Sequence, residues 1–417
     1  MGLPMLPVPP PFRARSARLA VSVLFFANGA LVASIVPRLP AIKATLGLSN
    51  AELGAAVAAM PVGGLIAGGL VGMLIARFGS GRAACSGGVL YCVALAGLGF
   101  APSWLALAAV YFVMGVFDAA MDASMNTHGL VVQRAYGRSI LQGFHGTWSL
   151  GGMAAGALGA AAAGMGVPVA AHLAVVGLVL ALAILATSGP LIRAKAADAP
   201  IPGGGAPGPI ERIHARNAPR LMRILLPVAM LGVMTAIAQA TASTWSAVYL
   251  TESLGLSAGV AAIAFVLYAA SMTAGRLVND RFVDRLGAIA MVRIGALAAA
   301  VGLALAIAAG PLHLPALAFV GFAAIGLGTS PMFPIMIAAA GTRPGIPAGY
   351  GVALAAWLVR IGMVISPALI GVAADSAGLG AAFGIPLVIV VVMIPLAPVL
   401  AGVRWIPAPP REMPAPA

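Results

Sequence analysis

Charged side chains are scarce in this 417-residue chain, which has ten acidic residues and 8% charged residues overall. Hydrophobic residues make up 61% of the sequence, and the mean hydropathy is +1.06. A water-soluble protein of this size needs a polar surface, and too few polar residues are present to form one. The composition therefore excludes a soluble globular protein and predicts a chain that is embedded largely in lipid.

Cysteine and histidine are also rare. Cys85 and Cys92 lie about two turns apart on one predicted helix, too far for a disulfide to join them. No phosphate-binding loop accompanies a segment large enough to hydrolyse ATP. The histidines are scattered among different segments without the spacing of metal ligands: His128, His145, His172, His214 and His313. We therefore expect no catalytic residues, no metal and no other cofactor, so the chain is not expected to be an enzyme.

Long apolar runs recur along the sequence, separated by short interruptions. A helix needs about 20 mostly apolar residues to cross a bilayer, and lipid-facing backbone must satisfy its own hydrogen bonds, which favours helices. We predict an all-α polytopic membrane protein with twelve transmembrane helices. They span residues 17–37, 51–76, 84–101, 104–128, 139–163, 168–190, 222–250, 258–279, 288–309, 315–340, 348–373 and 381–403.

The net charge of +13 reflects membrane orientation. Binding to nucleic acid would need a basic face on a soluble surface, whereas these charges occur in small groups between spans. With a cytoplasmic N-terminus, every lysine and arginine except Arg38, Lys43 and Arg360 falls on the cytoplasmic side, as the positive-inside bias predicts. We expect a monomeric, multi-pass protein of the cell inner (plasma) membrane with both termini in the cytoplasm.

An internal repeat divides the chain into two halves. The sequence Leu-Gly-Leu-Ser follows the first span at residues 46–49 and the seventh span at 254–257, an offset of 208 residues. The same offset carries residues 76–79 onto 284–287, so two landmarks agree on one register. We predict six-helix bundles over 1–190 and 222–405, a flexible cytoplasmic linker over 191–221, rich in alanine, proline and glycine, and a disordered tail over 406–417.

The loops at these landmarks carry a family motif. Gly72-Met-Leu-Ile-Ala-Arg-Phe-Gly-Ser-Gly-Arg82 and Asp284-Arg285-Leu286-Gly287 resemble the signature Gly-x-x-x-Asp-Arg-x-Gly-Arg of the major facilitator superfamily. Residues 28–40, 122–126 and 144–152 resemble a bacterial inner-membrane branch related to fucose permeases. The resemblance implies two pseudo-symmetric six-helix bundles. Charge contacts of Arg77, Asp284 and Arg285 would form a cytoplasmic gate, although positive-inside charge alone also explains the arginines.

Two carboxylates stand out inside the fourth span. Asp118, Asp122 and Asn126 are spaced by four and eight residues, so they lie along one helix face. An ionised carboxylate at membrane depth is costly unless it meets water, a partner or a proton. Such a group can load and release a proton as its exposure changes, whereas the alternative is a structural acid with a permanent partner. We assign proton coupling to this pair, with Asp122 favoured because it lies in the family-like segment.

Two basic residues are candidates to act with these acids. His145 is predicted to lie at a depth similar to that of Asp122, where it can share a proton, although a lone membrane histidine is often a packing residue. Arg360 lies about twelve positions into the eleventh span and needs an anion or a water-filled cavity. Its partner is Asp118 or Asp122 across the two halves, or a carboxylate or phosphate of the substrate.

Amide and aromatic side chains within the spans complete the predicted substrate site. An amide can hydrogen-bond a polar substrate, and a tryptophan near the midplane can stack on a ring, although plain packing explains an aromatic equally well. The predicted substrate-binding residues are Asn28, Asn126, Trp148, Gln239, Trp245, Tyr268, Trp357 and Arg360.

The sequence thus predicts a secondary active transporter. It would move a small polar metabolite, sugar-like or an organic anion, by alternating access with proton symport, its partners being the substrate, protons and the bilayer. Proton-driven efflux of amphipathic compounds is an alternative within transport. A membrane receptor or sensor is an alternative of another class, for which the chain offers no sensory domain.

Overall fold

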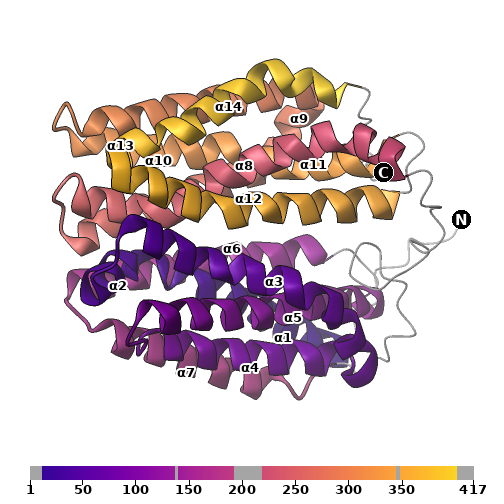
Figure 1. Cartoon of the computed structure of the whole chain (residues 1–417). Coiled ribbons are helices and arrows are strands. Elements are labelled where there is room, and N and C mark those ends of the chain that lie inside the picture. The colour runs from indigo at the N-terminus through magenta and orange to yellow at the C-terminus, as the bar shows by residue number, and fades with distance from the viewer. Residues whose placement is uncertain (1–11, 137–139, 192–217, 344–347, 402–417) are drawn as a thin grey trace, which may run out of the picture.

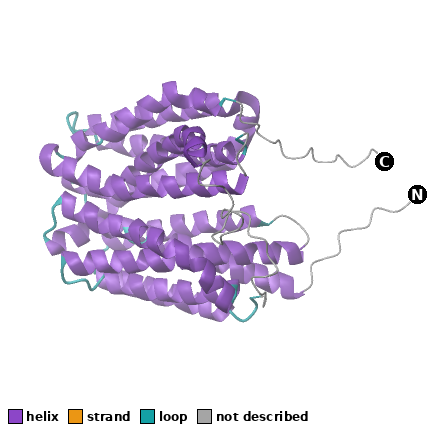
Figure 2. Cartoon of the chain, turned by 45° about the vertical axis from the view of Figure 1, so that its right-hand side comes forward, coloured by secondary structure: helices purple, strands orange, loops and turns teal. Residues whose placement is uncertain are grey.

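The structure is a computed structural model that describes residues 12–136, 140–191, 218–343 and 348–401. Within these ranges every regular element is a helix, as Figure 2 shows. Residues 192–217 of the predicted linker and the whole predicted tail, 406–417, lie outside the described residues. Eleven described segments are long and apolar enough to cross a membrane, and the 24-residue helix α6 lies between two of them in the chain. The predicted all-α polytopic fold is confirmed.

The helices of the first half follow the predicted spans closely. The largest difference is α5, which runs about two turns past the predicted end at residue 128. The elements are α1 (Phe12–Ala33), the short 3-10 helix η1 (Val36–Arg38), α2 (Leu39–Leu46), α3 (Asn50–Phe78), α4 (Ser80–Leu98), α5 (Trp104–Tyr136), α6 (Leu141–Gly164) and α7 (Val169–Thr187).

Two predicted spans of the second half, 315–340 and 381–403, differ in detail. Spans 258–279 and 288–309 are confirmed as two helices, which share the label α9 and are separated by the non-helical backbone of Gly287 (φ 80°, ψ 162°). Span 315–340 is broken before Met332, since Pro331 has no N–H to donate. Span 381–403 is divided into short helices. The elements are α8 (Ala218–Glu252), α9 (Ala258–Ala309), α10 (Pro315–Thr329), α11 (Met332–Gly341), α12 (Ala348–Ala377), α13 (Leu379–Ala382), α14 (Gly384–Leu396) and η5 (Ala397–Leu400).

The two repeat landmarks have the same backbone geometry in both halves. Gly47 and Gly255 have φ of 61° and 67°, and Gly79 and Gly287 have φ of 81° and 80°. A residue with a β-carbon is strained in this left-handed region, so glycine is needed at each turn. The sequence repeat therefore corresponds to a repeated way of turning the chain between helices.

The helices form two bundles that lie against each other, as Figure 1 shows. Helices α1 and α3 to α7 make up one bundle, and α8 to α14 make up the other. The bundles meet mainly where α12 packs on α3 and where α6 packs on α9. Because the chain runs through the molecule an even number of times, the start of α1 and the end of η5 lie on the same side of the molecule. We call this side the terminal end and the other side the opposite end.

The opposite end is fastened by polar contacts between the bundles. Lys43 Nζ forms an ion pair with Glu252 at 2.6 Å and donates to Asn50 Oδ1 at 2.7 Å. The Asp375 carboxylate accepts hydrogen bonds from the backbone N–H groups of Asn50 and Ala51 at 2.8 and 2.9 Å, at the start of α3. These contacts hold the first bundle against the second, so the opposite end is closed.

Candidate functional site

The acids of α5 lie between the two bundles. Asp118 and Asp122 are half-buried and one turn apart on the helix. Asp118 Oδ1 accepts a hydrogen bond from Asn28 Nδ2 at 2.9 Å. Asp122 Oδ1 accepts one from Asn126 Nδ2 at 3.0 Å. Each carboxylate therefore has one amide donor, from α1 for Asp118 and from its own helix for Asp122.

Asn28 joins three helices of the first bundle. Its Oδ1 accepts a hydrogen bond from Trp148 Nε1 of α6 at 2.8 Å while its amide nitrogen binds Asp118 of α5. The neighbouring Gly29 makes this geometry possible, because a β-carbon there would lie 2.1 Å from the carbonyl oxygen of Trp148. Close approach of α1 to α6 thus brings the amide, the indole and the carboxylate together.

Arg360 of the second bundle and His145 of the first bundle both interact with these acids. The Arg360 guanidinium on α12 interacts electrostatically with both Asp118 and Asp122. It lies against α3, where a β-carbon on Gly64 would be 3.3 Å from Arg360 Nη1. His145, exposed on α6, also interacts electrostatically with Asp122. The structure therefore brings together four of the sequence-predicted residues from both bundles.

The predicted site residues of the second bundle differ in burial and in hydrogen bonding. Tyr268 is 5% exposed and donates through its hydroxyl to the Gln239 carbonyl at 3.3 Å. Gln239 Nε2 donates to the Thr329 carbonyl at 3.2 Å, which ties α8 to the end of α10. Trp357 is 52% exposed, three residues before Arg360. Trp245 is fully buried in the hydrophobic core, and its indole N–H has no hydrogen-bond partner among the described residues.

Sequence reasoning missed Arg276 as a site residue and counted it with the cytoplasmic basic residues. In the structure it is half-buried on α9, and its Nε is buried without a hydrogen-bond partner among the described residues. It interacts electrostatically with Tyr268 on its own helix and with His145 of the other bundle. Its position inside the predicted span 258–279, eight residues after Tyr268, was the signal that could have found it.

The predicted gate residues lie at the terminal end. Arg77 is in the last turn of α3, and Asp284 and Arg285 precede the reversal at Gly287. All three side chains are exposed. In the part of the chain that the structure describes, none of them forms an ion pair, and the Arg77 guanidinium lies 5.5 Å from the Phe78 ring centroid.

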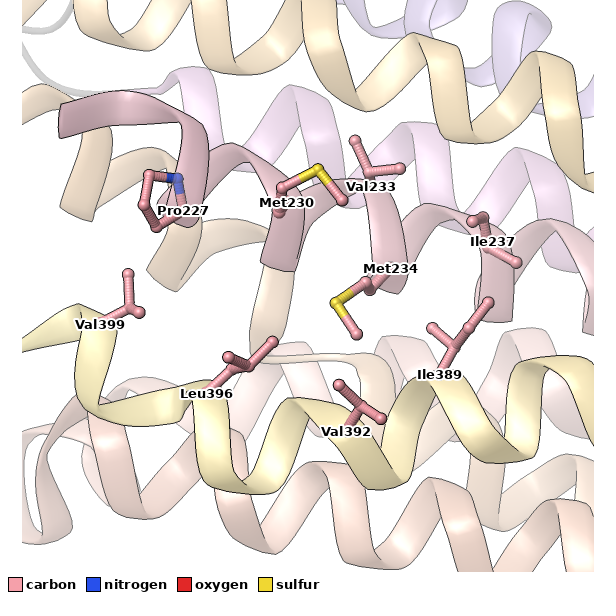
Figure 3. Close-up of a pocket in the computed structure, with 9 residues that line it drawn as sticks. All are labelled: Pro227, Met230, Val233, Met234, Ile237, Ile389, Val392, Leu396 and Val399. Atoms are coloured by element: carbon pink, nitrogen blue, oxygen red, sulfur yellow. The ribbon is translucent and has the colours of Figure 1, made fainter. Parts of the chain in front are cut away.

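A separate apolar groove lies between α8 and α14 (Figure 3). None of its side chains can orient a polar substrate or move a proton, so the groove is not the candidate site. It is lined by Pro227, Met230, Val233, Met234, Ile237, Ile389, Val392, Leu396 and Val399.

A charged cluster enclosed between two apolar helical bundles defines the class of protein. Helix termini and bundle interfaces at membrane depth are where secondary transporters hold their substrates and ions. The fold and the cluster together are those of a secondary transporter.

Comparison with known proteins identifies the family. The Major Facilitator Superfamily profile matches residues 21–346 and 249–417, and the chain belongs to this family. It is 31% identical over 372 residues to an uncharacterised transporter of this type from Yersinia pestis, covering 88% of this chain and 92% of the relative.

Solved transporters share the fold. The nucleoside transporter NupG superimposes with a TM-score of 0.74 at 14% identity, covering 92% of this chain and 98% of NupG. A D-xylose–proton symporter superimposes with a TM-score of 0.69 at 16% identity, covering 93% of this chain and 97% of the symporter. At these identities the likeness establishes the fold alone.

Proposed function

We propose that the protein is a proton-coupled symporter that brings a small polar metabolite into the cell across the inner membrane. The observation that carries the proposal is the position of Arg360, on α12, from which it interacts electrostatically with Asp118 and Asp122, on α5 of the other bundle. Alternating access requires the bundles to move relative to each other. An electrostatic attraction between the bundles makes that movement sensitive to the protonation of the two acids.

Protonation would act in the following way. While both carboxylates are ionised, they attract the Arg360 guanidinium across the interface. A proton on Asp122 or Asp118 weakens this attraction and frees the guanidinium to bind the substrate. Loss of the proton restores the attraction and displaces the substrate. Proton binding and substrate binding are thus linked through one arginine.

His145 supports a route for the proton. Its exposed ring on α6 interacts electrostatically with both Asp122 and Arg276. An imidazole can accept a proton on one nitrogen and donate from the other. In this proposal it passes protons between Asp122 and water at the terminal end, while Asn28 and Trp148 hold Asp118.

The polar contacts indicate which side is open. The described inter-bundle hydrogen bonds lie at the opposite end, and the gate residues Arg77, Asp284 and Arg285 are exposed at the terminal end. With both termini in the cytoplasm, as the positive-inside bias favours, this conformation faces the cytoplasm. The gate residues would come together only when the opposite end opens.

Relatives support the cargo class. The solved neighbours include a nucleoside transporter and a D-xylose–proton symporter, which are consistent with a small polar cargo and with proton coupling. The resemblance of residues 28–40, 122–126 and 144–152 to fucose permeases favours the same reading. Asn28, Asn126, Trp148, Gln239, Tyr268, Trp357 and Arg360 remain the proposed substrate contacts, with Trp245 in a supporting position behind them.

Gradient-driven accumulation tests this function even while the cargo is unidentified. Right-side-out membrane vesicles with and without the protein would be incubated in an isotope-labelled cell extract, acidic outside, and their contents identified by mass spectrometry. We expect at least one compound to accumulate only with the protein and to be lost when a protonophore collapses the gradient. Accumulation that survives the protonophore would refute coupling, and gradient-driven exit would identify an efflux antiporter.

A further inference from the structure

The apolar groove between α8 and α14 opens onto the outer surface of the second bundle. Its rim residues Met230, Val392 and Leu396 are exposed, whereas Met234 and Ile237 at its floor are buried. Helix α14 lies on the side of this bundle that faces away from the first bundle (Figure 1). Both helices belong to candidate membrane spans, so the open side of the groove faces the hydrocarbon region of the bilayer.

The groove is about as long as one leaflet of the bilayer is thick. Pro227 and Val399 lie opposite each other at one end of it, and Ile237 and Ile389 lie at the other (Figure 3). Ten residues of helix rise by roughly 15 Å, which is half of the hydrocarbon thickness of about 30 Å. Pro227 and Val399 are nearer the terminal end, because α8 begins there and η5 ends there. The groove therefore matches the length of an acyl chain in the leaflet at the terminal end.

Two guanidinium groups contact the wall of the groove that α14 and η5 form. Arg343, which follows α11, donates through Nη2 to the carbonyl oxygen of Val399. Its Nε is buried without a hydrogen-bond partner among the described residues. Arg293, exposed on α9, donates through Nε to the Ile394 carbonyl at 3.3 Å. Because a guanidinium has several N–H donors, each arginine keeps donors that these carbonyls do not use.

No acidic residue of the groove helices offsets these charges. Neither α14 nor η5 contains an aspartate or a glutamate, and the only one in α8 is Glu252, which lies at the opposite end. Among the described residues, neither Arg293 nor Arg343 forms an ion pair. The groove thus combines an apolar wall of leaflet length with positive charge at its terminal end.

We propose that the groove holds one acyl chain of an anionic phospholipid, with the phosphate of that lipid on the Arg343 guanidinium. Basic sites between transmembrane helices bind anionic lipid headgroups, and a guanidinium can bind a phosphate in bidentate fashion. Arg293 adds a second positive charge beside the same helix. With both termini in the cytoplasm, as proposed above, the lipid belongs to the cytoplasmic leaflet.

The lining of the groove favours a lipid over a small polar cargo. The groove has a volume of about 490 Å³, enough for a small ligand, but pockets for small ligands also contain a few polar groups that orient the ligand. Every lining residue here is apolar. An acyl chain needs no such groups, because the headgroup of the lipid is bound outside the groove.

Native mass spectrometry of the purified full-length protein tests the charge recognition. Phosphatidylglycerol, which is anionic, and phosphatidylethanolamine, which is zwitterionic, would be added in equal amounts with identical acyl chains. We expect the protein with one bound lipid to hold phosphatidylglycerol about five-fold more often, as one arginine near an anionic lipid should produce. Arg343→Gln should abolish this preference, whereas Arg281→Gln, at an exposed position on α9, should keep it.

Filling the groove tests the location of the lipid in the same spectra. Val392→Trp and Leu396→Trp each place an indole ring in the groove, and both variants should lose binding of phosphatidylglycerol. The matched control is Val388→Trp, at an exposed position on α14 that does not line the groove. This control should bind the lipid as the unmodified protein does.

Other occupants of the groove would give different spectra. Equal binding of both lipids by the unmodified protein, or an unchanged preference in Arg343→Gln, would overturn the role of the arginine. Retained lipid binding in both groove variants would place the lipid on another surface. Displacement of the lipid by glycerophosphoglycerol, the same headgroup without acyl chains, would indicate a site for free phosphate esters. Protein dimers that Val392→Trp separates would make the groove an interface between two copies of the chain.

Discussion

Lys43 and Glu252, 209 residues apart in the chain, form an ion pair of 2.6 Å between the two bundles. It is the only ion pair among the side chains that the structure describes. Lys43 follows η1 in the first bundle, and Glu252 ends α8 in the second. The pair closes the opposite end and must separate whenever that end opens.

Breaking this ion pair should favour the alternative conformation. Partly exposed pairs contribute about 1 kcal/mol, so Lys43→Gln or Glu252→Gln is expected to change the ratio of conformations by roughly five-fold. Distances between spin labels at the exposed positions Ala44 and Ser253, in a background without Cys85 and Cys92, would measure the change. The charge swap Lys43→Glu with Glu252→Lys should restore the original distribution. An unchanged distribution in both single variants would show that the pair does not hold this end.

Asp375 makes a second contact between the bundles at the same end. Its carboxylate accepts from the N–H groups of Asn50 and Ala51, where an anion is favoured by the helix N-terminus. Asp375→Ala should weaken closure by about 1 kcal/mol, measured with the same labels. Because Lys43 also binds Asn50, the double variant with Lys43→Gln should depart from the sum of the single effects. Strict additivity would indicate two independent contacts.

Asn28 should matter for stability as well as for transport. Asn28→Ala leaves the Trp148 N–H without its acceptor and Asp118 without its donor, and each loss costs about 1 to 3 kcal/mol when the group is buried. Trp148→Phe removes one of these hydrogen bonds and should destabilise the protein less. Thermal unfolding in detergent would rank the variants. Equal unfolding temperatures for Asn28→Ala and the unmodified protein would show that this network is not maintained.

The pattern of long apolar runs in the sequence made most of the fold predictable. Apolar runs of bilayer length can satisfy their backbone only as helices, and the repeat register identified glycines that share left-handed backbone geometry, Gly47 with Gly255 and Gly79 with Gly287. The break before Met332 was missed, since hydropathy does not report backbone direction.

The candidate site was predictable only in part. Acids inside an apolar run are costly, so composition alone singled out Asp118 and Asp122. Arg276 was missed because its place near the end of a span looks like positive-inside charge, and only packing shows that it faces His145. Similarly, sequence cannot distinguish Trp148, which binds Asn28, from Trp245, which is buried in the core.

The two roles of Arg360 can be separated by substitution. Arg360→Lys keeps the positive charge that faces Asp118 and Asp122 but loses the planar guanidinium that grips a carboxylate. We expect it to raise the KM for the cargo while gradient-driven accumulation persists, and Arg360→Met to abolish accumulation. Initial rates in vesicles over a range of cargo concentrations would show the difference. Unimpaired accumulation by Arg360→Met would remove the arginine from the proposed mechanism.

The central claim is that Asp122 couples cargo movement to protons, and Asp122→Asn tests it most directly. Uptake against a gradient and exchange of labelled for unlabelled cargo should be measured in the same vesicles, with Asp198→Asn, in the predicted linker outside the described residues, as control. The account predicts that Asp122→Asn loses gradient-driven accumulation but retains exchange, since exchange needs no net proton movement. Accumulation by Asp122→Asn equal to that of the unmodified protein would contradict it.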